Sequence, residues 1–338
     1  MSRAFGMKAF VVHGPGEAGV AEVAEPEPGV GEVVVEVERA GVCGTDVEFF
    51  TGEMEYLAEG HARYPMRLGH EWCGTVVRAG EGVHPAWVGR RAVGDTMLGC
   101  GRCRRCRGGR PHTCADRQEV GIRGGRAGAL AERLAVPVTS LHELPDGIDG
   151  PLGALVEPGG NAVRAARAAA GERVLVLGPG TIGLLTALFA RAAGAEVHLV
   201  GTTPSSLEFA RSLGFPATAD LPEPPFDAVV DATNDPSSPA RGLGLVEPGG
   251  RLVCIGLAGT PSRMDARSLV FKDVTAIGIL SASPGLADAV DAYARGDVDP
   301  RPLVAATVGL DGVAAVLAGE RPAGALAGPK ILVDPQQL

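Results

Sequence analysis

Four cysteines gather in one short stretch, "CGRCRRCRGGRPHTC", at residues 100–114. They are Cys100, Cys103, Cys106 and Cys114, spaced C-x2-C-x2-C-x7-C among arginines. Such a stretch can be a metal site, a disulfide cluster or a basic surface for nucleic acid. Four thiolates close a tetrahedral zinc site with bonds of roughly 2.3 Å, and four cysteine ligands leave no open position. The spacing therefore favours a structural zinc that holds a Gly/Arg-rich lobe in place.

A second set of metal-binding residue types is dispersed along the chain. Cys43 lies in "AGVCGTDVEFF", His70 and Glu71 in "RLGHEWCG", and Glu157 in "LVEPGGN". Taken singly, these residues fit ordinary roles: a small buried cysteine, a core histidine and solvated charges. One thiolate, one imidazole and one carboxylate together leave the fourth position of a zinc ion open, which is typical of a catalytic site.

A glycine-rich turn follows an apolar stretch at residues 173–177 and opens an amphipathic one at 181–194. Its residues are Gly178, Gly180, Thr181, Ile182 and Gly183. In a strand–turn–helix context, the first glycine makes the turn, the second lets the backbone approach a pyrophosphate, and the third allows close packing. The free N–H groups of the helix start favour phosphates. The alternative is an ordinary tight turn, but the context predicts a dinucleotide site.

The next strand, at residues 196–200, ends without the Asp or Glu that holds the 2′-hydroxyl of NAD. Gly201 occupies that position, and hydroxyl residues follow at Thr202, Thr203 and Ser206. Without the carboxylate, a 2′-phosphate meets no repulsion, although no arginine stands nearby to clamp it. This pattern favours NADP over NAD, with dual use open. The alternative is a helix N-cap cluster.

Composition limits the class of protein. The 338 residues suggest about two domains, and 45% of them are hydrophobic. The net charge of −9 makes the chain a poor general binder of nucleic acid. We see no secretory signal and no apolar run long enough to span a membrane, so a cytoplasmic protein is expected. In that compartment clustered cysteines are metal ligands more often than disulfides.

The motifs together resemble those of the zinc-dependent medium-chain dehydrogenase/reductase superfamily. "GHEWCGTVVRAG" is similar to its G-H-E-x-x-G-x-V-x-x-x-G signature, and "CGTD", the four-cysteine lobe and "VLVLGPGTIG" follow its order of motifs. "EP" at 157–158 resembles the sorbitol, threonine and glucose dehydrogenase branch. The resemblance implies an α/β chain with a GroES-like, mostly β catalytic domain over 1–156 and a Rossmann domain over 157–298. A C-terminal segment, 299–338, would rejoin the catalytic domain, and Ser2–Gly6 would be an extra lead-in.

The resemblance also implies roles for individual residues. Cys43, His70 and Glu157 would bind the catalytic zinc, with Glu71 beside it or alternating as a ligand. Thr45 would take the substrate's hydroxyl proton into a relay. Asp46 would hydrogen-bond the His70 ring and fix its tautomer.

The chain departs from the family pattern near the substrate. Glu48 replaces the histidine that often continues the proton relay, while Asn161 and Arg164 add an amide and a cation. We therefore expect NAD(P)-dependent interconversion of a secondary alcohol and a ketone. The expected substrate is a polar polyhydroxylated molecule, such as a sugar, polyol, cyclitol or aminocyclitol.

Other classes of function remain open at this stage. They are a non-catalytic dinucleotide-binding relative, a zinc-containing nucleic-acid binder, and a zinc-free quinone reductase, which both zinc sets disfavour. The family implies a homodimer or homotetramer that acts on a small molecule, without nucleic acid or membrane as partners.

Overall fold

Valine-rich stretches form strands in the first part of the chain. The computed structural model describes residues 6–337, so most of the expected lead-in lies outside the described residues. Strand β3 (Glu32–Gly41) buries Val33, Val34 and Val35 completely. Both of its faces are therefore covered, which explains a continuous apolar run where a half-exposed strand would alternate.

The chain forms two compact units. Unit 1 comprises residues 1–157, 304–326 and 330–338, and unit 2 comprises 158–303 and 327–329. No helix between residues 6 and 337 combines the length and apolarity needed to cross a membrane.

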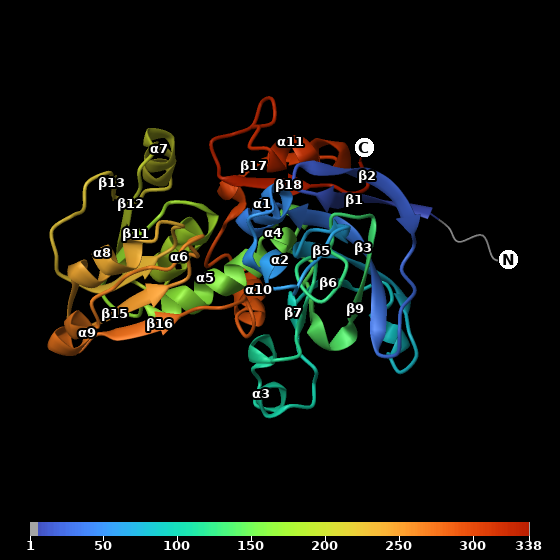
Figure 1. The fold of residues 1–338 in the computed structure, drawn as a ribbon, viewed down its shortest axis with the longest axis horizontal. Helices are drawn as coiled ribbons and strands as arrows, with labels where there is room; N and C mark the ends of the chain where they lie inside the picture. Colours follow the sequence, from blue (N-terminus) through green and yellow to red (C-terminus); the bar gives the residue numbers. More distant parts are fainter. Residues whose placement is uncertain (1–5, 338) are drawn as a thin grey trace. The chain divides into compact units, whose positions relative to one another are not determined.

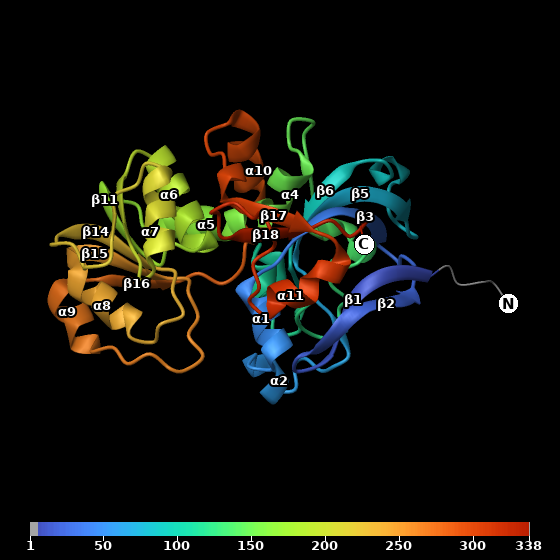
Figure 2. The ribbon, with the colours of Figure 1, turned by 90° about the horizontal axis from the view of Figure 1, so that it is seen from above.

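Three sheets form unit 1 (Figures 1 and 2). The three-stranded sheet has the order β2-β1-β4, and its strands are β1 (Gly6–Gly14), β2 (Glu17–Ala24) and β4 (Met66–Arg67). The seven-stranded sheet runs β10-β6-β5-β3-β18-β17, with β9 also paired to β3. Besides β3, its strands are β5 (Glu71–Ala79), β6 (Arg91–Gly94), β9 (Arg133–Pro137), β10 (Leu141–Glu143), β17 (Val304–Val308) and β18 (Lys330–Val333). The third pairs β7 (Met97–Leu98) with β8 (Gln118–Glu119).

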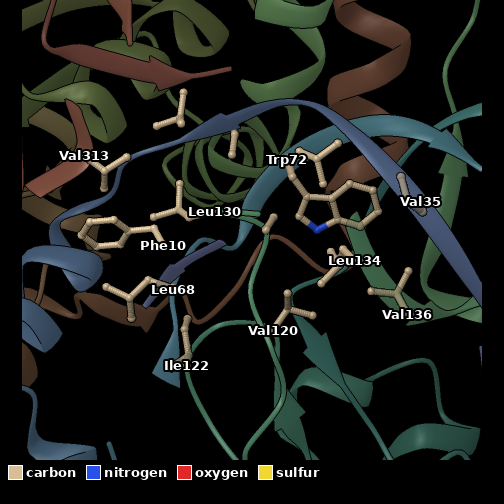
Figure 3. Packing of buried hydrophobic residues seen from close by; sticks show 14 of the residues in the cluster. Phe10, Val35, Leu68, Trp72, Val120, Ile122, Leu130, Leu134, Val136 and Val313 are labelled. Carbon is tan, nitrogen blue, oxygen red and sulfur yellow. The ribbon is translucent and has the colours of Figure 1, made fainter. Parts of the chain in front are cut away.

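Short helices complete unit 1. They are α1 (Gly44–Thr51), α2 (Glu55–Ala58), α3 (Arg104–Arg107), α4 (Gly150–Ala154) and α11 (Val313–Leu317), with 3-10 turns at Pro85–Trp87, Pro111–Thr113, Val138–Ser140 and Leu310–Gly312. The core gathers apolar side chains from distant segments, including Phe10, Leu68, Trp72 and Leu130 (Figure 3). Strand β18, from the end of the chain, pairs with β3, so the C-terminal segment is part of this unit's main sheet.

Unit 2 is built on a six-stranded parallel sheet with the order β13-β12-β11-β14-β15-β16. Its strands are β11 (Arg173–Leu177), β12 (Glu196–Val200), β13 (Ala217–Thr218), β14 (Phe226–Asp231), β15 (Val246–Cys254) and β16 (Thr275–Gly278). Its helices are α6 (Thr181–Ala192), α7 (Pro204–Ser212), α8 (Ser238–Leu245), α9 (Ala266–Lys272) and α10 (Leu286–Arg295), with a 3-10 turn at Arg301–Leu303; α5 (Val156–Ala168) begins in unit 1 and continues into unit 2. The strand order reverses its direction at β11, so right-handed crossovers place helices on both faces of the sheet (Figure 2).

Candidate metal and cofactor sites

The N-terminus of α1 is anchored to the segment that precedes β5. Cys43 is the N-cap of the helix, and its backbone N–H donates to Asp46 Oδ2 at 2.9 Å. The other carboxylate oxygen, Asp46 Oδ1, accepts the backbone N–H of Gly69 at 3.1 Å. Asp46 is fully buried, so one carboxylate fixes the backbone beside Cys43 to the backbone beside His70.

Three donor atoms converge in unit 1. Cys43 Sγ, a ring nitrogen of His70 and a carboxylate oxygen of Glu71 lie within 4.8 Å of one another. His70 Nδ1 lies 3.6 Å from Asp46 Oδ1, which is an ion-pair distance, too long for a hydrogen bond. Burial favours the neutral ring, yet the negative charge of Asp46 and a hydrogen bond with Cys43 outweigh it and raise the pKa of His70 well above its ordinary value. His70 and Glu71 are buried and Cys43 is half-buried, and this N, S and O donor set fits a zinc ion.

Glu157 lies close to this group but outside it. Its Oε1 atom and Thr96 Oγ1 are 3.3 Å apart, and the same hydroxyl donates to His70 O at 3.1 Å. Burial raises the pKa of Glu157 to about 7, with an opposing influence from His70 and a further increase from Glu71. Two carboxylates thus flank the cysteine and histidine. The assignment of Glu157 as the ligand stays a prediction.

Lys330 is a residue of this site that the motifs did not indicate. It is 2% exposed in β18, its Nζ donates to Val42 O at 2.8 Å, and it forms an ion pair with Glu71. Burial acts to lower the pKa of Lys330, but Glu71, Cys43 and Asp46 together raise it, so the side chain carries its charge. In the sequence, Lys330 could have been noticed because it directly precedes the apolar residues of "KILV". Thr96 stands in no pattern that would have indicated a role in the site.

The relay residues lie on α1, directly after the cysteine. Thr45 and Glu48 are both half-buried. Burial and the nearby charge of Glu53 raise the pKa of Glu48. Their helix begins at the cysteine donor, but their part in a proton relay stays a prediction.

The four-cysteine lobe brings its thiols together as the spacing predicted. All four Sγ atoms lie within 4.8 Å of one another, and Cys103 Sγ is 3.5 Å from Cys106 Sγ and 3.8 Å from Cys114 Sγ. Sulfurs around one tetrahedral zinc lie about 3.8 Å apart, given the Zn–S bond length. Hydrogen bonds from backbone N–H groups lower the pKa of Cys100 to about 6, which favours a thiolate. The donor set fits a closed zinc site.

The glycine turn in unit 2 has the stereochemistry that its sequence predicted. Gly178 has φ +95°, and a Cβ there would lie 2.9 Å from Ala232 O. A Cβ on Gly183 would lie 1.9 Å from Gly178 O, so helix and strand pack without room for a side chain. Nothing lies within 4 Å of a Cβ on Gly180. Thr181 begins α6, and Ile182 O accepts from the Thr186 hydroxyl. The turn fits a pyrophosphate at the helix start.

The end of β12 is closed to an acidic side chain. A Cβ on Gly201 would lie 2.5 Å from Pro179 Cγ, so the glycine turn itself excludes a residue with a carboxylate here. Thr202 and Thr203 are exposed, and the Thr203 hydroxyl donates to Ser206 Oγ at 2.6 Å.

The two expected substrate residues lie on α5. The Arg164 guanidinium donates to the backbone carbonyls of Leu280, at 2.8 Å, and Ser281. These bonds tie α5 to a loop of the same unit, which gives Arg164 a structural role. Asn161 is half-buried. Contact of either residue with substrate stays a prediction.

Comparisons with known proteins identify the family of the chain. The alcohol dehydrogenase GroES-like domain matches residues 29–146, and the zinc-binding dehydrogenase model matches residues 181–295. L-threonine 3-dehydrogenase of Idiomarina loihiensis is 32% identical over 275 residues, covering 76% of this chain and 79% of that protein. The chain therefore belongs to the zinc-dependent medium-chain dehydrogenase/reductase family, and the predicted family is confirmed.

Solved structures support the same conclusion. A structure described as a zinc-binding dehydrogenase from Sinorhizobium meliloti 1021, bound to NADP, superimposes with a TM-score of 0.87 at 30% identity, covering 98% of this chain and 100% of that one. One described as a short chain alcohol dehydrogenase from E. coli CFT073, with NADH, has a TM-score of 0.86 at 26% identity, covering 97% and 99%. The chain is a zinc-dependent alcohol dehydrogenase with GroES-like and Rossmann-type domains. It uses a nicotinamide dinucleotide and acts on a small-molecule substrate.

Proposed function

We propose that this enzyme interconverts a secondary alcohol and a ketone on a polar polyhydroxylated substrate, with NADP as the preferred cofactor. The observation that carries the proposal is the convergence of Cys43, His70 and Glu71 in unit 1, with Glu157 beside them. Zinc in such a site supplies Lewis acidity to a substrate oxygen. The glycine turn around Gly178 and Gly180 would hold the nicotinamide dinucleotide, which would supply or accept the hydride.

The chain's own residues would position the donors and move the proton. Asp46 holds the Cys43 and His70 segments together through two backbone N–H groups. The Thr45 hydroxyl would accept the substrate proton, and Glu48 would pass it to solvent. A raised pKa brings Glu48 closer to the working pH, which helps a residue that must both take and release a proton.

Two features support the preference for NADP. Gly201 removes the carboxylate that would repel a 2′-phosphate, and the exposed hydroxyls of Thr202 and Thr203 stand at the start of α7. The similar structure from Sinorhizobium meliloti is bound to NADP. The proposed second zinc would lie in the lobe of Cys100, Cys103, Cys106 and Cys114. The family also favours a homodimer or homotetramer.

The polyhydroxylated class is supported by two polar side chains that depart from the family pattern near the substrate, Glu48 and Asn161. The third, Arg164, is bound to the carbonyls of Leu280 and Ser281. A small hydroxylated substrate is also supported by the names of two relatives, an L-threonine 3-dehydrogenase and a 2R,3R-butanediol dehydrogenase from Bacillus subtilis.

The test is the near-ultraviolet absorbance of reduced nicotinamide, with zinc-loaded protein, NAD or NADP, and panels of sugars, inositols, aminocyclitols, polyols and simple alcohols. The expected result is turnover on one polyhydroxylated class with a higher kcat/KM for NADP. Turnover confined to simple alcohols would overturn the substrate class. Nucleotide binding without turnover on any panel would favour a non-catalytic relative.

A further inference from the structure

A hollow of about 380 Å³ lies in unit 1, and none of the proposed metal ligands lines it. Its volume lies within the range of small-molecule sites. Apolar side chains from three segments form much of its wall, among them Val11 of β1, Val23 of β2 and Ile122. The remaining wall carries three arginines, Arg63, Arg67 and Arg126.

Arg67 is the central cation of this hollow. It lies opposite Val11 in the β1–β4 pair and is half-buried. Its guanidinium has no hydrogen-bond or ion-pair partner among residues 6–337, and burial lowers its pKa. Side chains alternate along an extended segment, so Leu68 enters the apolar core (Figure 3) while Arg67 faces the hollow. An uncompensated, partly desolvated guanidinium is a ready partner for an oxyanion.

Arg126 is only partly satisfied by protein groups. One terminal nitrogen donates to Glu32 Oε1 at 2.5 Å, whereas its buried Nε has no acceptor within residues 6–337. Glu32 Oε2 accepts the Gly29 N–H at 3.1 Å, and this hydrogen bond keeps the Glu32 carboxylate in place beside Arg126. The charge of Glu32 offsets one guanidinium. Arg67 and the exposed Arg63, which has no ion-pair partner in the described chain, leave two positive charges without compensation.

We propose that this hollow binds a phosphate dianion, as inorganic phosphate or as a phosphate monoester with a small apolar body. Two uncompensated guanidinium charges match the charge of the dianion, and the planar donors match its oxygens. Because Cys43, His70, Glu71 and Glu157 do not line the hollow, the phosphate belongs to an effector and is not part of the reacting molecule.

The site can communicate with the metal centre through a short connection. Arg67 O accepts the Gly128 N–H at 2.9 Å and Leu68 O accepts the Leu130 N–H at 3.0 Å, and His70 follows two residues later. The segment from the phosphate site to the metal-binding histidine is therefore held by backbone hydrogen bonds. A ligand on Arg67 acts on the residues that precede His70.

Titration calorimetry of the full-length protein with inorganic phosphate, at fixed ionic strength with chloride as the control, tests the site. We expect saturable binding that Arg67→Met and Arg63→Met each weaken about tenfold or more, since each removes a charge-assisted contact. Glu32→Gln should strengthen binding, because it frees Arg126. Arg90→Met is the matched control and should bind as the parent does, since Arg90 is exposed and paired with Glu143 outside the hollow.

Absence of saturable phosphate binding, or equal affinity in the parent and Arg67→Met, would overturn the proposal. Glu32→Gln keeps the test decisive if Arg67→Met fails to fold, because unchanged or weaker binding in that variant also contradicts it. A phosphate monoester with a small apolar body, such as propyl phosphate, added during alcohol turnover tests whether the phosphate belongs to an effector or to the substrate. Non-competitive behaviour towards the alcohol supports an effector site, and strict competition would reassign the phosphate to the substrate.

Discussion

Lys330 of β18 forms an ion pair with Glu71 of β5 across the intervening strand β3. Gly41 of β3 is the register partner of both Glu71 and Leu332. A Cβ on Gly41 would lie 2.1 Å from Glu71 Oε2 and 2.9 Å from Lys330 Cε. The glycine thus leaves the space in which the two side chains meet, and the pair neutralises a carboxylate of the proposed metal centre inside the protein.

Lys330→Met should destabilise the protein and change how it holds zinc. Removing one partner of a buried ion pair costs about 3–5 kcal/mol because the remaining charge is uncompensated. A bound cation compensates Glu71 in part, so urea unfolding should show a larger loss for chelator-treated than for zinc-loaded protein. Lys272→Met is the matched control, since the partners of Lys272 Nζ among residues 6–337 are the backbone carbonyls of Leu243, Gly244 and Val246, with no carboxylate. An equal loss with and without zinc in Lys330→Met would contradict the link.

Gly41→Ala should separate the pair without removing either charge. The added methyl group overlaps Glu71 Oε2, so we expect a loss of about 1–3 kcal/mol in the free energy of unfolding and weaker zinc retention against a chelator. Gly19→Ala in β2 is the control, because no atom lies within 4 Å of its Cβ position. Parent-like zinc retention in Gly41→Ala would mean that the Glu71–Lys330 contact does not support the metal.

Glu157→Gln should reduce kcat by about 100-fold or more while the fold remains, if Glu157 is a zinc ligand. The amide keeps the shape and removes the charge, so circular dichroism should be unchanged. Glu71→Gln is the comparison, and a smaller effect there would assign the resting carboxylate ligand to Glu157. Full activity in Glu157→Gln would exclude it as a ligand.

Much of both metal sites was predictable because their cysteines and histidine lie in compact motifs. C-x2-C-x2-C-x7-C keeps four thiols on one loop, and Cys43 and His70 each stand in a recognisable run. The Rossmann-type unit followed from strand and helix alternation around Gly178.

The remaining features depend on contacts between segments far apart in the chain. Lys330 reaches Glu71 only because β18 joins the sheet beside β3, and no local pattern records that pairing. The meeting of Arg67 and Arg126 around one hollow has the same origin. Whether Glu71 or Glu157 binds the proposed zinc depends on differences of a few ångströms in side-chain position. The spacing of residues in the sequence does not encode such differences.

Glu48 should determine the acid limb of the pH–rate profile. Burial, and then the charge of Glu53, raise the pKa of Glu48 above the ordinary 4.5. A carboxylate in a proton relay loses its function as the pH falls through its own, raised pKa. Glu48→Gln should lower the rate and remove this limb. Glu53→Gln should shift the limb to lower pH, because it removes one cause of the raised pKa. An unchanged acid limb in both variants would exclude Glu48 from the relay.

The raised pKa of Glu48 also makes the stability of the fold depend on pH. Because the folded pKa of Glu48 exceeds its unfolded value, ionisation of Glu48 destabilises the fold as pH rises through these values. Glu48→Gln should therefore be more stable than the parent at neutral pH, with the gain disappearing below both pKa values. Urea midpoints measured near pH 7 and near pH 3.5 check the sign. A gain that persists at the lower pH would have another cause.

Cys103→Ser should remove the proposed structural zinc and open the lobe to trypsin. Between residues 100 and 114 only His112 and Cys114 are buried, and the regular structure amounts to α3 and one 3-10 turn (Figure 1). The lobe has little apolar core of its own, so the proposed zinc would supply its folding free energy. Its exposed arginines, including Arg104, Arg105 and Arg107, are then natural cleavage sites.

The matched control is Cys254→Ser, which changes a cysteine outside both donor groups and should keep two zinc ions and trypsin resistance. One zinc ion with an uncut lobe in Cys103→Ser would show that the lobe is held by its backbone and not by a metal, and two zinc ions would show that Cys103 is not a required ligand.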